Sequence, residues 1–170
     1  MGSDPSPNLR NRELFQVFDA SEIEEIEQLL AITEPPDGTT IIQAGKTATD
    51  LERAIHIVIT GEVSVSTTPT AANQVPVARI LKPGEIFGLV AFVTDGRHTA
   101  SCTAKGPVRI ASLPRRSLDA LANGREALAA KIFQVICGQL ARDLRACDRR
   151  LANALHKRLE WGDLPSFVSR

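Results

Sequence analysis

The sequence has 170 residues and a formal net charge of +0 at pH 7, with 24% charged and 4% aromatic residues. This length suits one domain, or one domain with a long helix, and the balanced charge argues against a protein that binds nucleic acid through bulk positive charge. No apolar run reaches membrane-spanning length and residues 1–11 are too polar for a signal peptide, so we expect a cytoplasmic protein.

The N-terminal part predicts a leader followed by one amphipathic helix. Residues 1–12, rich in Pro, Ser and Asn, are expected to be disordered. Ser21 and Glu24 have the spacing of a capping box, which predicts that the helix opens at Ser21. Its buried stripe is expected to contain Ile23, Ile26, Leu29 and Leu30, whereas Glu22, Glu24, Glu25 and Glu27 are expected to form a solvated face.

From Glu34 the pattern changes to short strands separated by turns. The β-forming runs are 39–43, 55–65, 75–81, 99–103 and 108–113. The second of them is expected to be two strands on either side of Gly61, and residues 66–74 predict a polar loop. About eight short strands with frequent glycines indicate a jelly-roll or β-roll, so we expect a mainly β domain with flanking helices over residues 13–125.

One stretch within this domain has the pattern of an anion cradle. Gly88 precedes a short apolar segment, Val90 to Val93, which fits a helix that ends at the Asp95-Gly96 turn. A glycine before a helix N-terminus leaves backbone N–H groups free and lets an anion approach them closely. A buried corner between two strands would show much the same pattern.

After Pro114 the sequence predicts a short helix over 117–121 and a long one over 126–160. Apolar residues in the long helix alternate spacings of four and three, which is typical of an a/d seam over three heptads. The seam contains Phe133, Cys137, Leu140, Leu144, Cys147, Leu151 and Ala154. It predicts a homodimer through a parallel pair of helices. A second apolar stripe, expected to lie on the roll, contains Leu128, Ile132 and Ile136. The basic residues off the seam are expected to be solvated; they are Arg142, Arg145, Arg149, Arg150 and Lys157.

Nothing in the sequence indicates catalysis or a metal site. The three histidines, His56, His98 and His156, lie far apart, so the paired-His spacing of a metal cupin is missing. No Ser, His and acid arrangement is visible, and we expect a protein that is not an enzyme and has no cofactor. The three cysteines have no metal-type spacing and are expected to be buried free thiols.

The cradle resembles a motif of a known family. Phe87-Gly88-x-x-Ala91, a turn, and a basic residue before Thr99-Ala100-Ser101 resemble the phosphate-binding cassette of the cyclic nucleotide-binding domain family. The run 55–65 and the N-terminal Leu-Phe-x-x-Phe are similar to other parts of that family, with His56 where an aromatic residue usually lies. The resemblance covers roughly Leu14 to Leu155 and implies a ligand-binding cassette formed by Gly88, Leu89, Val90, Ala91, Arg97, His98, Thr99 and Ala100.

Two positions depart from the family motif. The resemblance implies a glutamate that accepts from the ribose 2′-hydroxyl where this chain has Leu89, and a phosphate-binding arginine where it has His98, with Arg97 one place early. A charge-assisted hydrogen bond contributes about 1.5–3 kcal/mol, so loss of two predicts cyclic nucleotide binding that is absent or weaker by on the order of 10²–10⁴-fold. The ligand implied is cAMP or cGMP.

Two functions therefore stay open at this point. One is a regulatory module that senses a cyclic nucleotide or another small anion and transmits through its C-terminal helix. The other is a degenerate, non-binding domain that serves as a dimerisation or protein-interaction module. Only about a dozen residues follow Arg158, residues 161–170 being a tail, so we expect no DNA-binding domain in this sequence. Its effector is then an unidentified separate protein, or the chain is part of a longer one.

Overall fold

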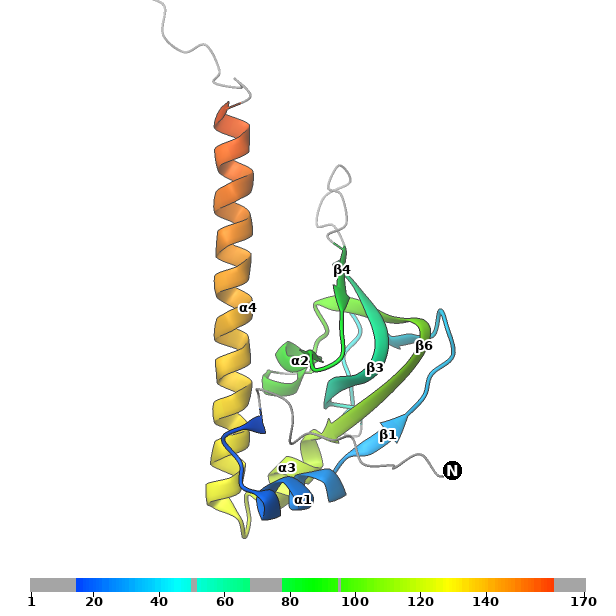
Figure 1. Cartoon of the computed structure of the whole chain (residues 1–170), viewed down its shortest axis with the longest axis vertical. Helices are drawn as coiled ribbons and strands as arrows, with labels where there is room; N and C mark the ends of the chain where they lie inside the picture. The colour runs from blue at the N-terminus through cyan, green and yellow to red at the C-terminus, as the bar shows by residue number, and fades with distance from the viewer. Residues whose placement is uncertain (1–14, 50–51, 68–77, 95, 161–170) are drawn as a thin grey trace, which may run out of the picture. The chain divides into compact units, whose positions relative to one another are not determined.

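The computed structural model describes residues 15–49, 52–67, 78–94 and 96–160 (Figure 1). The predicted leader, the predicted tail and most of the predicted loop 66–74 lie outside these residues. The chain divides into two compact units, Met1–Val135 and Ile136–Arg170. The boundary falls within the last helix, so its first turns belong to the first unit.

The first unit is an antiparallel sheet with flanking helices. The described elements are α1 (Ala20–Gln28), β1 (Ala31–Thr33), β2 (Thr40–Ile42), β3 (Ala54–Thr67), β4 (Ala78–Leu81), β5 (Ile86–Phe87), α2 (Leu89–Val93), β6 (Ala100–Pro114), α3 (Arg115–Leu121) and α4 (Glu126–Glu160). The sheet order is β1-β6-β3-β4, with β2 also paired to β6 and β5 to β3. The predicted fold class, a mainly β roll with flanking helices and a long C-terminal helix, is confirmed.

Two long strands replace four predicted short ones. The run around Gly61 is one continuous strand, β3, whose register against β6 shifts between Val58 and Thr60 and again between Thr60 and Glu62. Gly61 has φ +79°, and a Cβ there would overlap the carbonyl of Pro107 and approach the Cα of Val108 to 2.9 Å. The glycine therefore bends the strand without ending it. β6 likewise joins the predicted runs 99–103 and 108–113, so the described residues form six strands and the prediction of about eight is wrong.

The core of the roll lies between these strands. It contains Ile42, Val58, Val63, Leu81, Phe87, Cys102, Ala104, Val108 and Ile110. Burial raises the pKa of the Cys102 thiol to about 12, so this cysteine is a protonated apolar group at neutral pH. The prediction of a buried free thiol is confirmed for Cys102 but is wrong for Cys137 and Cys147, which are exposed on α4.

The first helix begins two residues earlier than predicted. Asp19 is the N-cap of α1: its carboxylate accepts from the backbone N–H of Glu22 at 2.9 Å, and the Glu22 carboxylate accepts from the N–H of Asp19 at 2.9 Å. Ser21 lies in the first turn and donates to the Asp19 carboxylate. The predicted capping box at Ser21 is therefore wrong, because Asp19 and Glu22 have the same spacing and already close the helix end.

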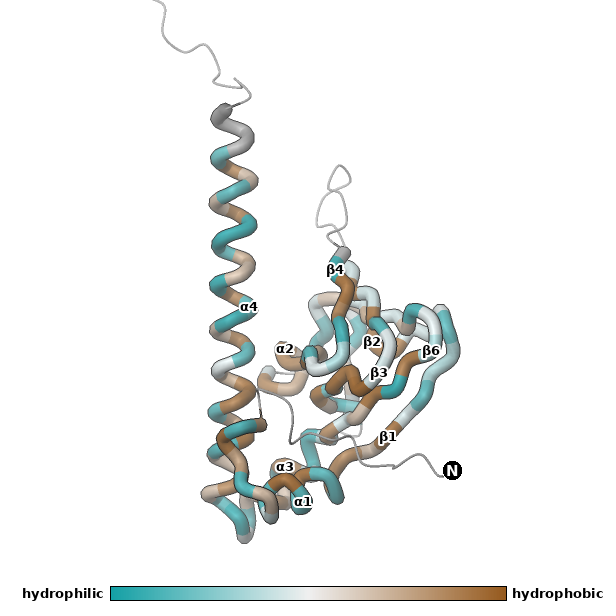
Figure 2. Tube along the Cα trace, in the orientation of Figure 1, coloured by the Kyte–Doolittle hydropathy of each residue, from teal (hydrophilic) through white to brown (hydrophobic). Residues whose placement is uncertain are grey.

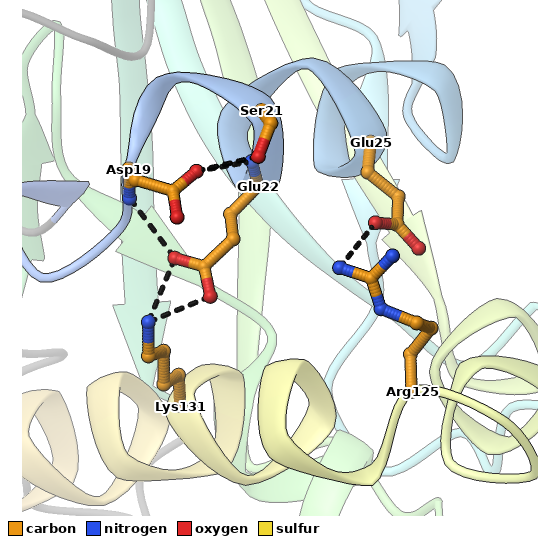
Figure 3. A network of polar contacts seen from close by, with 6 residues as sticks. All are labelled: Asp19, Ser21, Glu22, Glu25, Arg125 and Lys131. Atoms are coloured by element: carbon orange, nitrogen blue, oxygen red, sulfur yellow. Dashed lines mark hydrogen bonds and ion pairs between the residues drawn. The ribbon is translucent and has the colours of Figure 1, made fainter.

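Glu22 also corrects the expectation of a fully solvated acidic face. It is buried, and both of its oxygens accept from Nζ of Lys131 in the first turns of α4, at 2.6 and 2.8 Å (Figure 3). A second ion pair, Arg125 to Glu25 at 2.9 Å, lies beside it. In the same part of α4, Leu128 and Ile132 are buried as expected. The start of α4 is therefore attached to α1.

The second unit contains the rest of α4, and the predicted long helix is confirmed. Hydrophobic and hydrophilic residues alternate along this part (Figure 2). Leu144 is 63% exposed and Leu151 is 59% exposed, so two seam leucines are open to solvent. Among the described residues, no helix combines the length and the apolar character needed to cross a membrane.

Candidate functional site

The predicted cassette begins at a glycine that no other residue can replace without strain. Gly88 has φ +83° and is the N-cap of α2, directly after β5. A Cβ at this position would lie 2.8 Å from the carbonyl oxygen of Ala54 and 3.1 Å from Cδ2 of His56. The left-handed turn and the close approach to β3 both require glycine, which fixes where α2 starts.

The first turn of α2 offers backbone donors rather than side chains. The N–H groups at the start of a helix have no acceptor within that helix. In α2 these donors are the amides of Leu89, Val90 and Ala91. The side chains of Leu89 and Ala91 are 4% and 2% exposed, respectively, and face the core. Leu89 therefore contributes only its amide, since its side chain has no acceptor and is buried.

The second half of the cassette is fixed by pairing with residues 45–48. The N–H of Gly45 donates to the carbonyl of His98 at 2.8 Å, and the N–H of His98 donates to the carbonyl of Lys46 at 3.0 Å. Arg97 forms an isolated antiparallel bridge with Thr47. This pairing sets the positions of Arg97, His98 and Thr99 before β6 begins.

Strand β2 brings the two halves of the cassette together. Ile42 pairs with Cys102 of β6, and its Cδ1 lies 3.4 Å from the Cβ position of Gly88. Gly88 of the first half, and Cys102, which follows the second half in β6, therefore both lie beside Ile42 of β2.

The two basic residues of the cassette differ in charge at neutral pH. Burial lowers the pKa of His98 below its ordinary value of 6.5, and Glu52 raises it only in part. His98 is therefore neutral at pH 7. Arg97 is exposed and keeps its charge at any physiological pH. The permanent cation of this site is Arg97, one position before the one that the family motif uses.

His56 of β3 packs against the residue that directly precedes the cassette. Its ring stacks on Phe87, with 4.9 Å between ring centroids, and its Nδ1 lies 2.8 Å from Oγ of Ser112. Burial lowers the pKa of His56 to about 4, so the ring is neutral at pH 7. The histidine takes the place of the aromatic residue implied by the family resemblance, and it packs as one.

Sequence reasoning missed two arginines at the other end of α2. Nη2 of Arg53 donates to the carbonyl of Thr94 at 2.6 Å and to that of Phe92 at 3.2 Å. Nη1 of Arg115 donates to the same Phe92 carbonyl at 2.9 Å. Their separation in the sequence hides this convergence, which only the pairing of β3 with the end of β6 produces.

Similarity to known proteins identifies the family of this chain. A family model described as "Cyclic nucleotide-binding domain" matches residues 33–125. The chain belongs to the cyclic nucleotide-binding domain family. The match covers β2 to α3 and includes the whole cassette. The resemblance inferred from the sequence is confirmed.

Particular members of the cyclic nucleotide-binding domain family are similar along most of this chain. The CRP-like cAMP-activated global transcriptional regulator of Mycobacterium tuberculosis is 25% identical over 157 residues, which cover 92% of this chain and 64% of that protein. The crystal structure of the Thermus thermophilus catabolite activator protein matches with a TM-score of 0.68 and 26% identity, covering 83% of this chain and 62% of that one. The chain thus spans less than two thirds of the length of these relatives.

A third likeness concerns the fold alone. A cyclic nucleotide-binding domain from Methylobacillus flagellatus matches with a TM-score of 0.72 at 20% identity, covering 81% of this chain and 74% of that one.

Proposed function

We propose that this chain is a regulatory module, not an enzyme, that senses a cyclic nucleotide or another small anion at its cassette and transmits through its C-terminal helix. The observation that carries the proposal is Gly88, whose left-handed conformation and tight packing on β3 fix the start of α2 and the position of its first amides. This backbone arrangement suits a phosphate, because the amides at a helix start are donors that an anion can approach, and Arg97 of the same cassette supplies a permanent cation.

The ligand class proposed is cAMP or cGMP, bound weakly. The name of the Mycobacterium tuberculosis relative describes it as cAMP-activated, which supports cAMP as the first candidate. Leu89 offers no acceptor for a sugar hydroxyl and His98 is neutral at pH 7. Loss of two charge-assisted contacts weakens binding by on the order of 10²–10⁴-fold relative to an intact cassette.

Calorimetric titration of the purified chain with cAMP, cGMP and inorganic phosphate tests this proposal. Weak binding is expected in wild type and is expected to be lost in Arg97→Ala, whereas the control Arg116→Ala, an exposed arginine on α3, keeps it. Tight cAMP binding that Arg97→Ala leaves unchanged would contradict the proposed site. Phosphate binding without nucleotide binding would assign the site to another small anion.

The burial of Leu89 and the neutrality of His98 also favour a second candidate, a degenerate domain that dimerises or binds proteins without any nucleotide. This candidate predicts no heat with any of the three ligands, although the protein stays folded and self-associates.

In both candidates the chain forms a homodimer through α4 in the cytoplasm, and its effector is a separate protein or another part of a longer chain. The exposure of Leu144 and Leu151 supports self-association, because solvent-exposed leucines at heptad spacing lose little and gain burial when two helices pair. Three free cysteines are consistent with a reducing compartment.

A further inference from the structure

The C-terminal end of the cassette helix is held by two guanidinium groups. Arg53 donates to the carbonyls of Phe92 and Thr94, and Arg115 donates to that of Phe92. The last carbonyls of a helix have no partner within it and carry partial negative charge, so two cations stabilise this end. With five residues, α2 is only about 7.5 Å long at a rise of 1.5 Å per residue, and a movement at its start displaces its end.

Of the two arginines, Arg115 also contacts α4. Its guanidinium carbon lies 5.5 Å from the centroid of the Phe92 ring and 5.9 Å from that of the Phe133 ring. Phe133 belongs to the part of α4 within the first compact unit. One side chain therefore contacts the ring and the carbonyl of a cassette-helix residue and an aromatic ring of the C-terminal helix.

Further bonds fix the position of Arg115. Its N–H donates to the carbonyl of Arg53 at 2.7 Å, and its Nε donates to the Asp119 carboxylate of α3 at 2.8 Å. The side chain is only 27% exposed. A group held this firmly moves with its partners, so a shift of Phe92 either breaks the bond from Nη1 or changes how the guanidinium lies on Phe133.

From this geometry we infer that Arg115 is the positioning residue through which a displacement of the cassette helix reaches the start of α4. The inference rests on the proposed function, in which the cassette acts on the C-terminal helix, and it identifies the contact that carries the signal. Only arginine suits this position, because its planar fork donates in two directions while its faces lie against aromatic rings; lysine offers a point charge.

The test perturbs the cassette without ligand and measures amide hydrogen exchange in the full chain by mass spectrometry. Gly88→Ala strains the start of α2, because the added Cβ meets the carbonyl of Ala54. In the wild-type background this change is expected to alter exchange over residues 126–135 by roughly fivefold or more, the lower end of typical coupling between sites. In the Arg115→Ala background the same change is expected to leave that exchange unaltered.

Two further variants keep the test decisive. Arg116→Ala is the matched control, and in this background residues 126–135 should respond to Gly88→Ala as in wild type. If Gly88→Ala does not fold, Thr94→Val replaces it, since it removes the 2.7 Å bond from Oγ1 of Thr94 to the carbonyl of Val90. If Arg115→Ala does not fold, Phe133→Leu replaces it, because it removes the ring in α4 and keeps an apolar side chain.

The outcomes separate this inference from the proposed function. An equal response of residues 126–135 with and without Arg115 would overturn the role of Arg115 and leave transmission to α4 intact. No response in any background would overturn transmission itself. A response that is lost only in Arg115→Ala or Phe133→Leu would support the inference.

Discussion

At the scale of single residues, His56 makes the stability of the roll depend on pH. Its pKa is lowered from 6.5 to about 4 by burial, so the unfolded chain binds a proton more readily than the folded one. The contribution of neutral His56 to the stability of the folded chain is therefore complete above pH 6.5 and is lost as the pH falls toward 4. Between pH 7 and pH 5 the free energy of unfolding should fall by on the order of 2 kcal/mol from this group.

Urea unfolding of wild type and His56→Phe at pH 7 and pH 5 measures this contribution. Phenylalanine keeps the stacking on Phe87 and removes the proton, so the variant should lose much of the pH dependence. His98 titrates in the same window with a lowered pKa and accounts for part of what remains. An unchanged pH dependence in His56→Phe would show that His56 is not the group responsible.

The cassette gives a second prediction at this scale. His98→Arg places a permanent cation at the position that the family motif uses, and it should raise cAMP affinity by at least roughly tenfold, as one charge-assisted bond allows. Wild-type binding should strengthen only below pH 6.5, because the pKa of His98 is lowered. Calorimetry at pH 7.5 and pH 5.5 tests both statements, and equal affinities throughout would contradict them.

Leu89→Glu behaves differently from His98→Arg on structural grounds. Because Leu89 is buried, a carboxylate there loses its hydration unless it turns toward a ligand. The substitution should lower the thermal unfolding midpoint without ligand, and saturating cAMP should recover part of that loss. A midpoint unchanged in both conditions would show that the Leu89 side chain has solvent access that its burial does not indicate.

For single residues, the sequence predicted which residues belong to the cassette better than it predicted their burial or their charge. It identified Gly88 from its place before a short helix, and Arg97 and His98 through the resemblance to the family motif. The structure places Gly88 beside Ile42 of β2 and pairs Arg97 with Thr47. The sequence did not predict that Leu89 faces the core or that the pKa of His98 is lowered. Both depend on contacts with residues far away in the chain, which spacing does not contain.

At the scale of elements, the ion pair between Glu22 and Lys131 attaches α1 to the start of α4. The bond from Lys131 lowers the pKa of Glu22 below its ordinary value, so the stabilisation is present above about pH 4.5 and is lost at lower pH. Glu22→Gln should lower the thermal unfolding midpoint at pH 7, with Glu27→Gln as the control on the same helix. Equal midpoints for the two variants at pH 7 would contradict the pairing.

The seam of α4 gives the second prediction for an element. Leu144→Glu should convert the proposed dimer to monomers, because pairing would bury an unpaired carboxylate. The residue is exposed in one chain, so the fold of the chain should be unaffected. Sedimentation equilibrium should distinguish it from the control Arg149→Glu, which lies off the seam. Monomeric wild type at high concentration would contradict self-association.

The exposed cysteines report the direction of that helix pair. In a parallel pair Cys147 lies opposite its own copy, as does Cys137, so mild oxidation should produce covalent dimers that Cys137→Ser with Cys147→Ser abolishes. Buried Cys102, with its pKa near 12, should not take part. Non-reducing electrophoresis checks this, and dimers that persist in the double variant would contradict it.

Elements were predictable where their signal is local. The seam spacing predicted α4 over 126–160, and the Pro114 boundary predicted α3 to within two residues. Strand boundaries were less predictable. Gly61 was expected to separate two strands, yet it lies inside β3, because β3 and β6 pair along most of their length. Cross-strand pairing overrides the local preference of a glycine.

For the whole molecule, the proposed function requires that a ligand bound at the short helix α2 alters the start of the long helix α4. The family match covers β2 to α3, and the contacts from Arg115 connect that region to Phe133. The sequence indicated the cassette and the long helix but not the contacts between them, since Arg53, Phe92 and Arg115 belong to no motif. Phe133 was predicted only as a residue of the helix seam. Their convergence follows only from the folded chain.

Hydrogen exchange of residues 126–135 with and without saturating cAMP, in the His98→Arg variant, tests this account most directly. Binding is first established by calorimetry, so that occupancy of the cassette is known. The account predicts that cAMP changes exchange at the start of α4 by roughly fivefold or more, and that Arg115→Ala abolishes the change while binding persists. Exchange at residues 126–135 that stays the same although cAMP is bound would contradict it.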